Sequence, residues 1–157
     1  MKNIKDALVK YDPDNKDYYE KNYETYSKKF DKLDKKYFTT LKPIKNKNII
    51  VAHEAFGYLC EDYNIKEEAI EGLVPDSEPD PVRMRQIIKF AKKNNVKTIF
   101  FEELVSPKVA ETIAKEINAN TAVLNPLEGL SEEQIKNGED YFSIMEQNLE
   151  AIYNSLK

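Results

Sequence analysis

The chain has 157 residues, 33% of them charged and 41% hydrophobic, which is typical of a single globular domain with a solvated surface. Its net charge of −4 argues against a nucleic-acid partner, because nucleic-acid ligands need a basic patch. The single cysteine, Cys60, excludes an internal disulfide and is interpreted as a small packing residue. The first residues, Met1–Lys5, are polar and lack the pattern of a signal peptide.

Two helices are predicted before any strand. Apolar residues at Ile4, Leu8 and Val9 predict a short amphipathic helix that ends at Asp12-Pro13-Asp14, a turn with a built-in helix cap. A long helix is predicted over Asn15–Leu41. Its apolar residues are spaced by three and four and form one stripe: Tyr19, Tyr23, Tyr26, Phe30, Leu33, Tyr37 and Leu41. Tyrosine has an apolar ring and a polar tip, so this stripe suits a partly covered helix at a domain junction, although an ordinary surface helix or a coiled-coil seam would share the spacing.

From Asn48 onward, apolar strands alternate with amphipathic helices. Strands are predicted over Asn48–Ala52, Glu68–Val74, Val96–Phe101 and Thr121–Leu124. Helices are predicted over Glu54–Tyr63, from Pro81 to Asn94-Asn95, from Ser106-Pro107 onward and over Asp140–Leu156, with an extended loop at Pro75–Pro81. Alternation of this kind predicts an α/β fold: one Rossmann-like lobe with about four parallel strands, flanked by helices and preceded by the long helix.

Polar groups follow three of the predicted strands: His53-Glu54, Glu102-Glu103, and Asn125 with Glu128. Because parallel strands end at one edge of a sheet, His53 and Glu128 can converge there. An imidazole combined with carboxylates suits zinc better than calcium or magnesium. The simpler interpretation is a hydrogen-bonded structural histidine with glutamates as caps or surface groups. The sequence has no phosphate-binding glycine motif, no GxSxG and no HExxH.

The stretch His53-Glu54-Ala55-Phe56-Gly57-Tyr58 resembles the zinc- and manganese-binding solute-binding proteins of ABC metal importers. Further segments that resemble the family follow in its order: Asp14 to Leu33, Glu78-Pro79-Asp80-Pro81, Ile99-Phe100-Phe101-Glu102, Leu124-Asn125-Pro126-Leu127-Glu128, and Tyr141-Phe142 with Met145 and Asn148-Leu149. Several motifs in one order are far more specific than any one of them.

The resemblance implies residues 1–43 as a short helix plus the helix that links two lobes, and residues 44–157 as the C-terminal metal-binding lobe. It implies His53 and Glu128 as metal ligands, Glu102 as a supporting residue, and Zn²⁺ in preference to Mn²⁺, because manganese importers often have glutamate at the position of His53. The implied partner is a membrane permease and the implied location is extracytoplasmic. The family's other ligands, typically two histidines of an N-terminal lobe, and its lipoprotein signal are not among these residues.

We therefore expect a non-enzymatic half-receptor that binds zinc weakly and in a pH-dependent way. We also expect self-association through Tyr18, Tyr19, Tyr23 and Tyr26, since a contiguous apolar patch is costly to leave wet. Two alternatives remain at this stage. One is an interaction module built on the long helix, and the other is a small hydrolase with His53 as base, oriented by Glu102 or Glu128.

Overall fold

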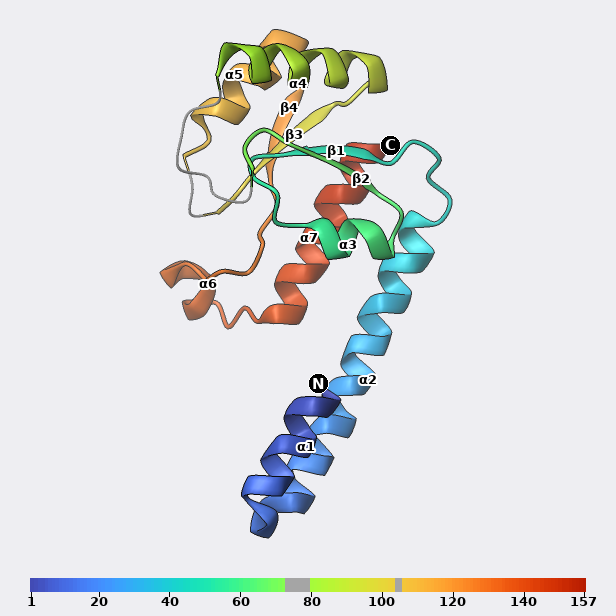
Figure 1. Ribbon diagram of the computed structural model, residues 1–157, viewed down its shortest axis with the longest axis vertical. Helices are drawn as coiled ribbons and strands as arrows, with labels where there is room; N and C mark the ends of the chain where they lie inside the picture. The colour runs from blue at the N-terminus through green and yellow to red at the C-terminus, as the bar shows by residue number, and fades with distance from the viewer. Residues whose placement is uncertain (73–79, 104–105) are drawn as a thin grey trace. The chain divides into compact units, whose positions relative to one another are not determined.

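The computed structural model describes residues 1–72, 80–103 and 106–157. They divide into two compact units, Met1–Thr39 and Thr40–Lys157. Figure 1 follows the elements along the chain by colour. Within the described ranges, no helix combines the length and the apolar composition needed to cross a bilayer.

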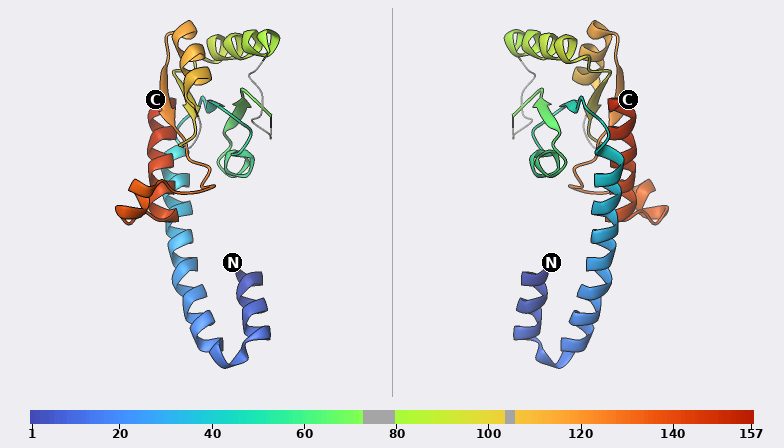
Figure 2. Two further views of the ribbon diagram at one scale, coloured as in Figure 1. Left: turned by 90° about the vertical axis from the view of Figure 1, so that its left-hand side faces the viewer. Right: turned by 90° about the vertical axis from the view of Figure 1, so that its right-hand side faces the viewer.

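The first unit is a pair of helices joined by one short turn. Helix α1 spans Lys2–Tyr11, the 3-10 turn η1 spans Pro13–Asn15, and helix α2 spans Lys16–Leu41, of which the last two residues fall in the second unit. Figure 2 shows α1 folded back against the first turns of α2. Proline at the start of η1 has its φ fixed near a helical value and needs no N–H partner there, which favours this tight reversal. Both predicted helices are confirmed.

The side chain of Asp12 fastens this reversal. Its Oδ2 accepts hydrogen bonds from the Tyr19 hydroxyl at 2.6 Å and from the Asn15 side-chain amide at 2.9 Å. These bonds, that of Tyr19 above all, hold the pKa of Asp12 below its usual value. Asp12 does not form the predicted side-chain cap at the start of η1, and its carboxylate accepts from these two side chains instead.

The second unit is a four-stranded parallel sheet covered by helices, which confirms the predicted fold class. Its strands run in the spatial order β2-β1-β3-β4. The strands are β1 (Asn48–Val51), β2 (Lys66–Ala69), β3 (Thr98–Phe101) and β4 (Asn120–Val123). The helices are α3 (Gly57–Asp62), α4 (Pro81–Asn94), α5 (Lys108–Ile117), α6 (Glu132–Lys136) and α7 (Tyr141–Leu156).

The order of the strands places a switch point between β1 and β3. After β1 the chain adds β2 on one side, and then β3 and β4 on the other. Ile50 of β1 is paired with Ile99 of β3. In open parallel sheets, the crevice at the carboxyl ends of the strands beside a switch point is the usual place for a ligand.

The core of this unit lies on both faces of β1 and β3. Ile50 and Ile99 pack with buried residues of α4 and α5, including Ile87 and Ile113. Successive strand residues point to opposite faces, so the fully buried Ile49 belongs to the other face, and α7 contacts β1 and β4. The burial of continuous apolar strands between helices accounts for their uninterrupted Ile, Val and Phe runs.

Two elements begin elsewhere than the sequence predicts. The helix after His53 begins at Gly57 instead of Glu54, because the Ala55 N–H bonds to the His53 carbonyl only two residues earlier, a tight turn that is not helical. The second strand is Lys66–Ala69 instead of Glu68–Val74. Its register against β1 sets these bounds, and positions 73 and 74 lie outside the described residues.

Helix α4 confirms the predicted start and end. Asp80 caps it by accepting from the backbone N–H groups of Val82 and Arg83, and Asn95 ends it in the left-handed conformation. Val82, an apolar residue of this helix, is 54% exposed and lies in its first turn. The proline-rich loop predicted over Pro75–Pro81 falls mostly on 75–79, which lie outside the described residues.

Helix α6 is a short element that the hydrophobic pattern did not predict. It rests on a capping box in which Ser131 accepts from the Gln134 backbone and the Gln134 side chain accepts from the Ser131 backbone. On α7, the buried residues are Ile144, Leu149, Ile152 and the polar Asn148.

Candidate metal centre

His53 lies just beyond the end of β1 and is buried, with 5% of its surface exposed. Glu102 directly follows β3 and is equally buried. Because Ile50 pairs with Ile99, the residues three positions further along each strand arrive side by side. The Nδ1 atom of His53 is hydrogen-bonded to Oε1 of Glu102. Strand register thus brings two polar side chains from distant positions together inside the lobe.

The hydrogen bond to Glu102 has a consequence for the imidazole. An ionised carboxylate can only accept a hydrogen bond, so His53 must carry its proton on Nδ1 to donate to it. In this tautomer, the Nε2 atom of a neutral imidazole has a free lone pair. Histidines that bind metals in proteins are usually oriented in this way, with the second nitrogen bonded to a carboxylate or carbonyl.

Glu128 faces the other side of the ring. It belongs to the loop after β4, Asn125–Gly129, which we call the Glu128 loop. Its Oε1 lies 3.9 Å from Nε2 of His53, and its side chain is 71% exposed. The distance is too long for a direct hydrogen bond. The imidazole therefore lies between a buried carboxylate that is bonded to Nδ1 and an exposed carboxylate near Nε2.

The three residues singled out in the sequence, His53, Glu102 and Glu128, come together in the structure. The neighbouring glutamates Glu54 and Glu103 are exposed and are not part of the arrangement. In the parts of the chain that the structure describes, no three or more His, Cys, Asp or Glu side chains form a group that could hold a metal ion by itself.

Two residues near the site were missed by sequence reasoning. Glu67 of β2 accepts the Phe56 N–H at 3.1 Å, and burial raises its pKa. Asn148 of α7 is 3% exposed and binds the backbone of the Glu128 loop. Asn148 had a detectable signal, because it is a polar residue on the apolar face of a predicted helix. Glu67 had no such signal, because it lies just before the strand predicted over Glu68–Val74.

Cys60 is not a candidate ligand. It lies in α3 and is 4% exposed. Burial raises the pKa of its thiol to about 12. Metal binding by cysteine requires the thiolate, which is scarce in such surroundings. The interpretation of Cys60 as a packing residue agrees with this environment.

Comparisons with known proteins point to one family. The family described as "Zinc-uptake complex component A periplasmic" (ZnuA) matches residues 1–155. The high-affinity zinc uptake system protein ZnuA of Bacillus subtilis is 51% identical over 156 residues, covering 99% of this chain and 49% of that protein. The chain thus spans about half the length of this curated relative.

Solved structures agree in fold. The Zn(II)-bound ZnuA-like domain of Streptococcus pneumoniae AdcA is 44% identical, with a TM-score of 0.82 over 98% of this chain and 57% of that chain. The laminin-binding protein Lbp of Streptococcus pyogenes is 36% identical, with a TM-score of 0.89 over 99% of this chain and 59% of that chain. Sequence and fold together lead to one conclusion: this chain belongs to the ZnuA family of zinc-uptake proteins.

Proposed function

We propose that this chain is the C-terminal, zinc-binding lobe and linking helix of a solute-binding protein that captures Zn²⁺ for an ABC importer. The observation that carries the proposal is the buried His53, whose Nδ1 is bonded to Glu102 and whose Nε2 faces Glu128. The names of the relatives support zinc as the cargo, since they include a zinc uptake protein and a Zn(II)-bound domain.

The distance between His53 and Glu128 suits a bridging zinc ion. Zinc binds imidazole nitrogen and carboxylate oxygen at about 2.0–2.2 Å with tetrahedral angles, which places the two ligand atoms roughly 3.3–3.5 Å apart. The observed Nε2–Oε1 distance is 3.9 Å. A small rotation of the exposed Glu128 side chain closes this difference. We infer that His53 and Glu128 are ligands and that Glu102 orients the imidazole from behind.

The donor set also favours zinc over harder cations. Calcium and magnesium prefer shells made only of oxygen, whereas zinc readily accepts a neutral imidazole beside a carboxylate. Two ligands fill half of a tetrahedral shell. We infer that the others come from the part of the receptor that the Bacillus relative has beyond the 49% matched here. Manganese remains the second choice.

Calorimetric titration of the chain with Zn²⁺ tests this function. We expect weak one-to-one binding that weakens further at acid pH, because zinc must displace protons from its ligands. H53A should abolish the binding and E128Q should reduce it. E133Q, which alters an exposed glutamate of α6, should leave it unchanged. Submicromolar affinity in the monomer would contradict the inference that this chain supplies only two of the four zinc ligands. Zinc binding that survives H53A would refute the assignment of His53 as a ligand.

The transport role adds a partner and a location. We infer that the complete receptor works outside the cytoplasm and delivers its ion to a membrane permease, as expected for a family described as periplasmic. The comparisons do not favour the hydrolase or the interaction module as the function of the chain. Release of zinc from the complete receptor to permease-containing vesicles, lost in H53A, would test this role.

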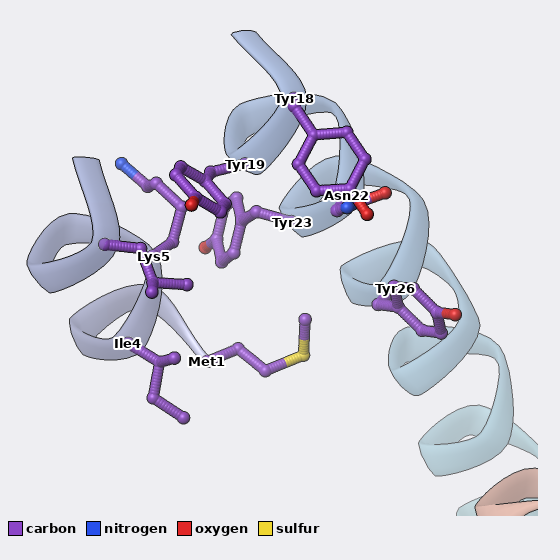
Figure 3. A pocket seen from close by; sticks show the side chains of 9 residues that line it. Met1, Ile4, Lys5, Tyr18, Tyr19, Asn22, Tyr23 and Tyr26 are labelled. Carbon is purple, nitrogen blue, oxygen red and sulfur yellow. The ribbon is translucent and has the colours of Figure 1, made fainter. Parts of the chain in front are cut away.

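We also infer that the first unit mediates self-association of this chain. A groove of about 290 Å³ lies between α1 and α2, and the surface exposed in it is almost entirely apolar, although Lys5, Asn22 and four tyrosines are among its lining residues (Figure 3). Ile4 and Tyr18 contribute exposed apolar surface, at 66% and 64% exposure. A contiguous apolar patch of this kind is costly to leave in water, and a second copy of the chain offers the same surface in return.

Light scattering over a range of concentrations tests this inference. The wild type should form dimers or larger species as concentration rises, and the double variant I4S/Y18S should stay monomeric. Y58S is a matched control, because Tyr58 is 90% exposed in the other unit. A wild type that remains monomeric at the highest concentration would refute self-association.

A further inference from the structure

The Glu128 loop is fastened from behind by one buried side chain of α7. The Asn148 Oδ1 accepts the backbone N–H of Asn125 at 2.9 Å, and the Asn148 Nδ2 donates to the backbone carbonyl of Asn125 at 2.7 Å. Both residues are buried, at 3% and 5% exposure. One side-chain amide thus satisfies both backbone groups of the first residue of the loop, as a neighbouring strand would.

Asn125 passes this constraint along the loop. Its Oδ1 accepts the N–H of Leu127 at 2.7 Å, which forms a tight turn of two residues. Leu127 has a φ of +64°, a left-handed conformation that a leucine rarely adopts without outside support. The next residue is Glu128. Its direction toward His53 therefore depends on a strained turn that the buried asparagines hold in place.

We propose that Asn148 is a positioning residue for metal binding, which sets the Glu128 loop so that the Glu128 carboxylate faces Nε2 of His53. This proposal rests on the proposed function. Glu128 is exposed, and its contact with His53 at 3.9 Å is too long to orient it. The pairing with Asn125 needs one donor and one acceptor in a single planar group of this length, which aspartate, serine and leucine do not provide.

The two asparagines differ in a way that allows a matched comparison. Asn125 Nδ2 is buried and, among the described residues, has no hydrogen-bond partner, whereas Asn148 Nδ2 donates to the Asn125 carbonyl and, more weakly, to the Met145 sulfur. N125D and N148D each place a carboxylate at a buried position. N125D removes only an unpaired donor and keeps the acceptor for Leu127, whereas N148D removes a donor that holds the loop. If bonding to the loop matters, N148D has the larger effect.

The first measurement is zinc titration arranged as a double-mutant cycle. N148D should weaken zinc binding about tenfold or more, as outer-shell partners of metal ligands do, and N125D should weaken it less. In an E128Q background, N148D should have little further effect, because both changes act on one ligand. N154D, on the exposed side of α7, should change nothing. Wild-type affinity in N148D, or an equal loss with and without Glu128, would overturn the proposal.

The second measurement does not depend on zinc. Amide hydrogen exchange at Leu127 should be slow in the wild type and N125D and fast in N148D. Serine at position 148 buries no charge but cannot make both bonds to Asn125. Amide exchange at Leu127 should therefore also be fast in N148S, which replaces N148D in this test if N148D does not fold. Slow exchange in both Asn148 variants would overturn the proposal. A wild type that binds no zinc but shows these exchange rates would refute the proposed function and confirm the hold on the loop.

Discussion

Substitution of Glu102 by glutamine tests whether a buried carboxylate sets the protonation state of the His53 imidazole, which we propose as a metal ligand. Glutamine has the same length and shape, but it is neutral and offers a donor as well as an acceptor. The His53–Glu102 pair is buried, with 6% of each side chain exposed. E102Q therefore changes the charge and the bonding options at Nδ1 of His53 and leaves the packing of the lobe in place.

The size of the effect follows from the bond that is changed. Hydrogen bonds to charged groups contribute about 1.5–3 kcal/mol to stability and neutral ones about 0.5–1.5 kcal/mol, so E102Q should lower the free energy of unfolding by about 1–1.5 kcal/mol. For a chain of this size, that loss corresponds to a fall in Tm of about 2–6 °C. The zinc affinity should fall by about 10–100-fold, which equals about 1.4–2.7 kcal/mol.

Nitrogen NMR of the imidazole provides a direct assay, because His53 is the only histidine in the chain. The wild type should show one tautomer, with the proton on Nδ1 and Nε2 unprotonated. In E102Q the amide can accept from Nδ1–H or donate to Nδ1, so a mixture of tautomers is expected. Zinc should shift the Nε2 signal of the wild type, and the shift should need more zinc in E102Q.

The neighbouring residue serves as the control. Glu103 is also a glutamate but is exposed, so E103Q should leave the Tm, the tautomer and the zinc affinity unchanged. An E102Q variant with the wild-type tautomer, Tm and zinc affinity would refute the reasoning, since Glu102 would then not act as an ionised acceptor for His53. Equal effects of E102Q and E103Q would point to the net charge of this edge instead.

Three further predictions concern other titratable groups. Burial raises the pKa of Glu67, so the folded state disfavours the ionised form of this carboxyl group. The free energy of unfolding therefore falls as pH rises through the range above the ordinary pKa of 4.5. The variant E67Q can still accept the Phe56 N–H, so it should raise the Tm at pH 7 and leave it unchanged below pH 4. The hydrogen bond from Tyr19, and then that from Asn15, lowers the pKa of Asp12. The stabilisation by the ionised Asp12 is therefore present at neutral pH and is lost as pH falls below the ordinary pKa of 3.8. D12N should speed amide exchange in α1 at pH 7, and an unchanged rate would count against the bond between Tyr19 and Asp12. Burial raises the pKa of the Cys60 thiol to about 12, so at pH 8 this thiol should react with a disulfide reagent about a thousandfold more slowly than a thiol with the ordinary pKa of 9.0. Rapid labelling of Cys60 in the folded chain would contradict the burial of this side chain.

Much of the second unit could be predicted from sequence because its signals are local. Apolar runs such as Ile49–Val51 identify buried strands, and the spacing of Ile87 and Ala91 identifies an inward helical face. Asp80 and Asn95 have side chains and backbone preferences that begin and end a helix within a few residues. Parallel connection then follows from the alternation of strands and helices, which also placed His53 at the correct edge of the sheet.

What only the tertiary structure decided depends on contacts between distant segments. The register of β1 against β3 brings Glu102 to Nδ1 of His53, and no local pattern encodes that register. The packing of α7 beside the sheet lets Asn148 hold the Glu128 loop, whereas in the sequence it is one polar residue in an apolar stripe. Burial decides these roles, because a polar group removed from water must find a partner, and the fold determines which partner is within reach.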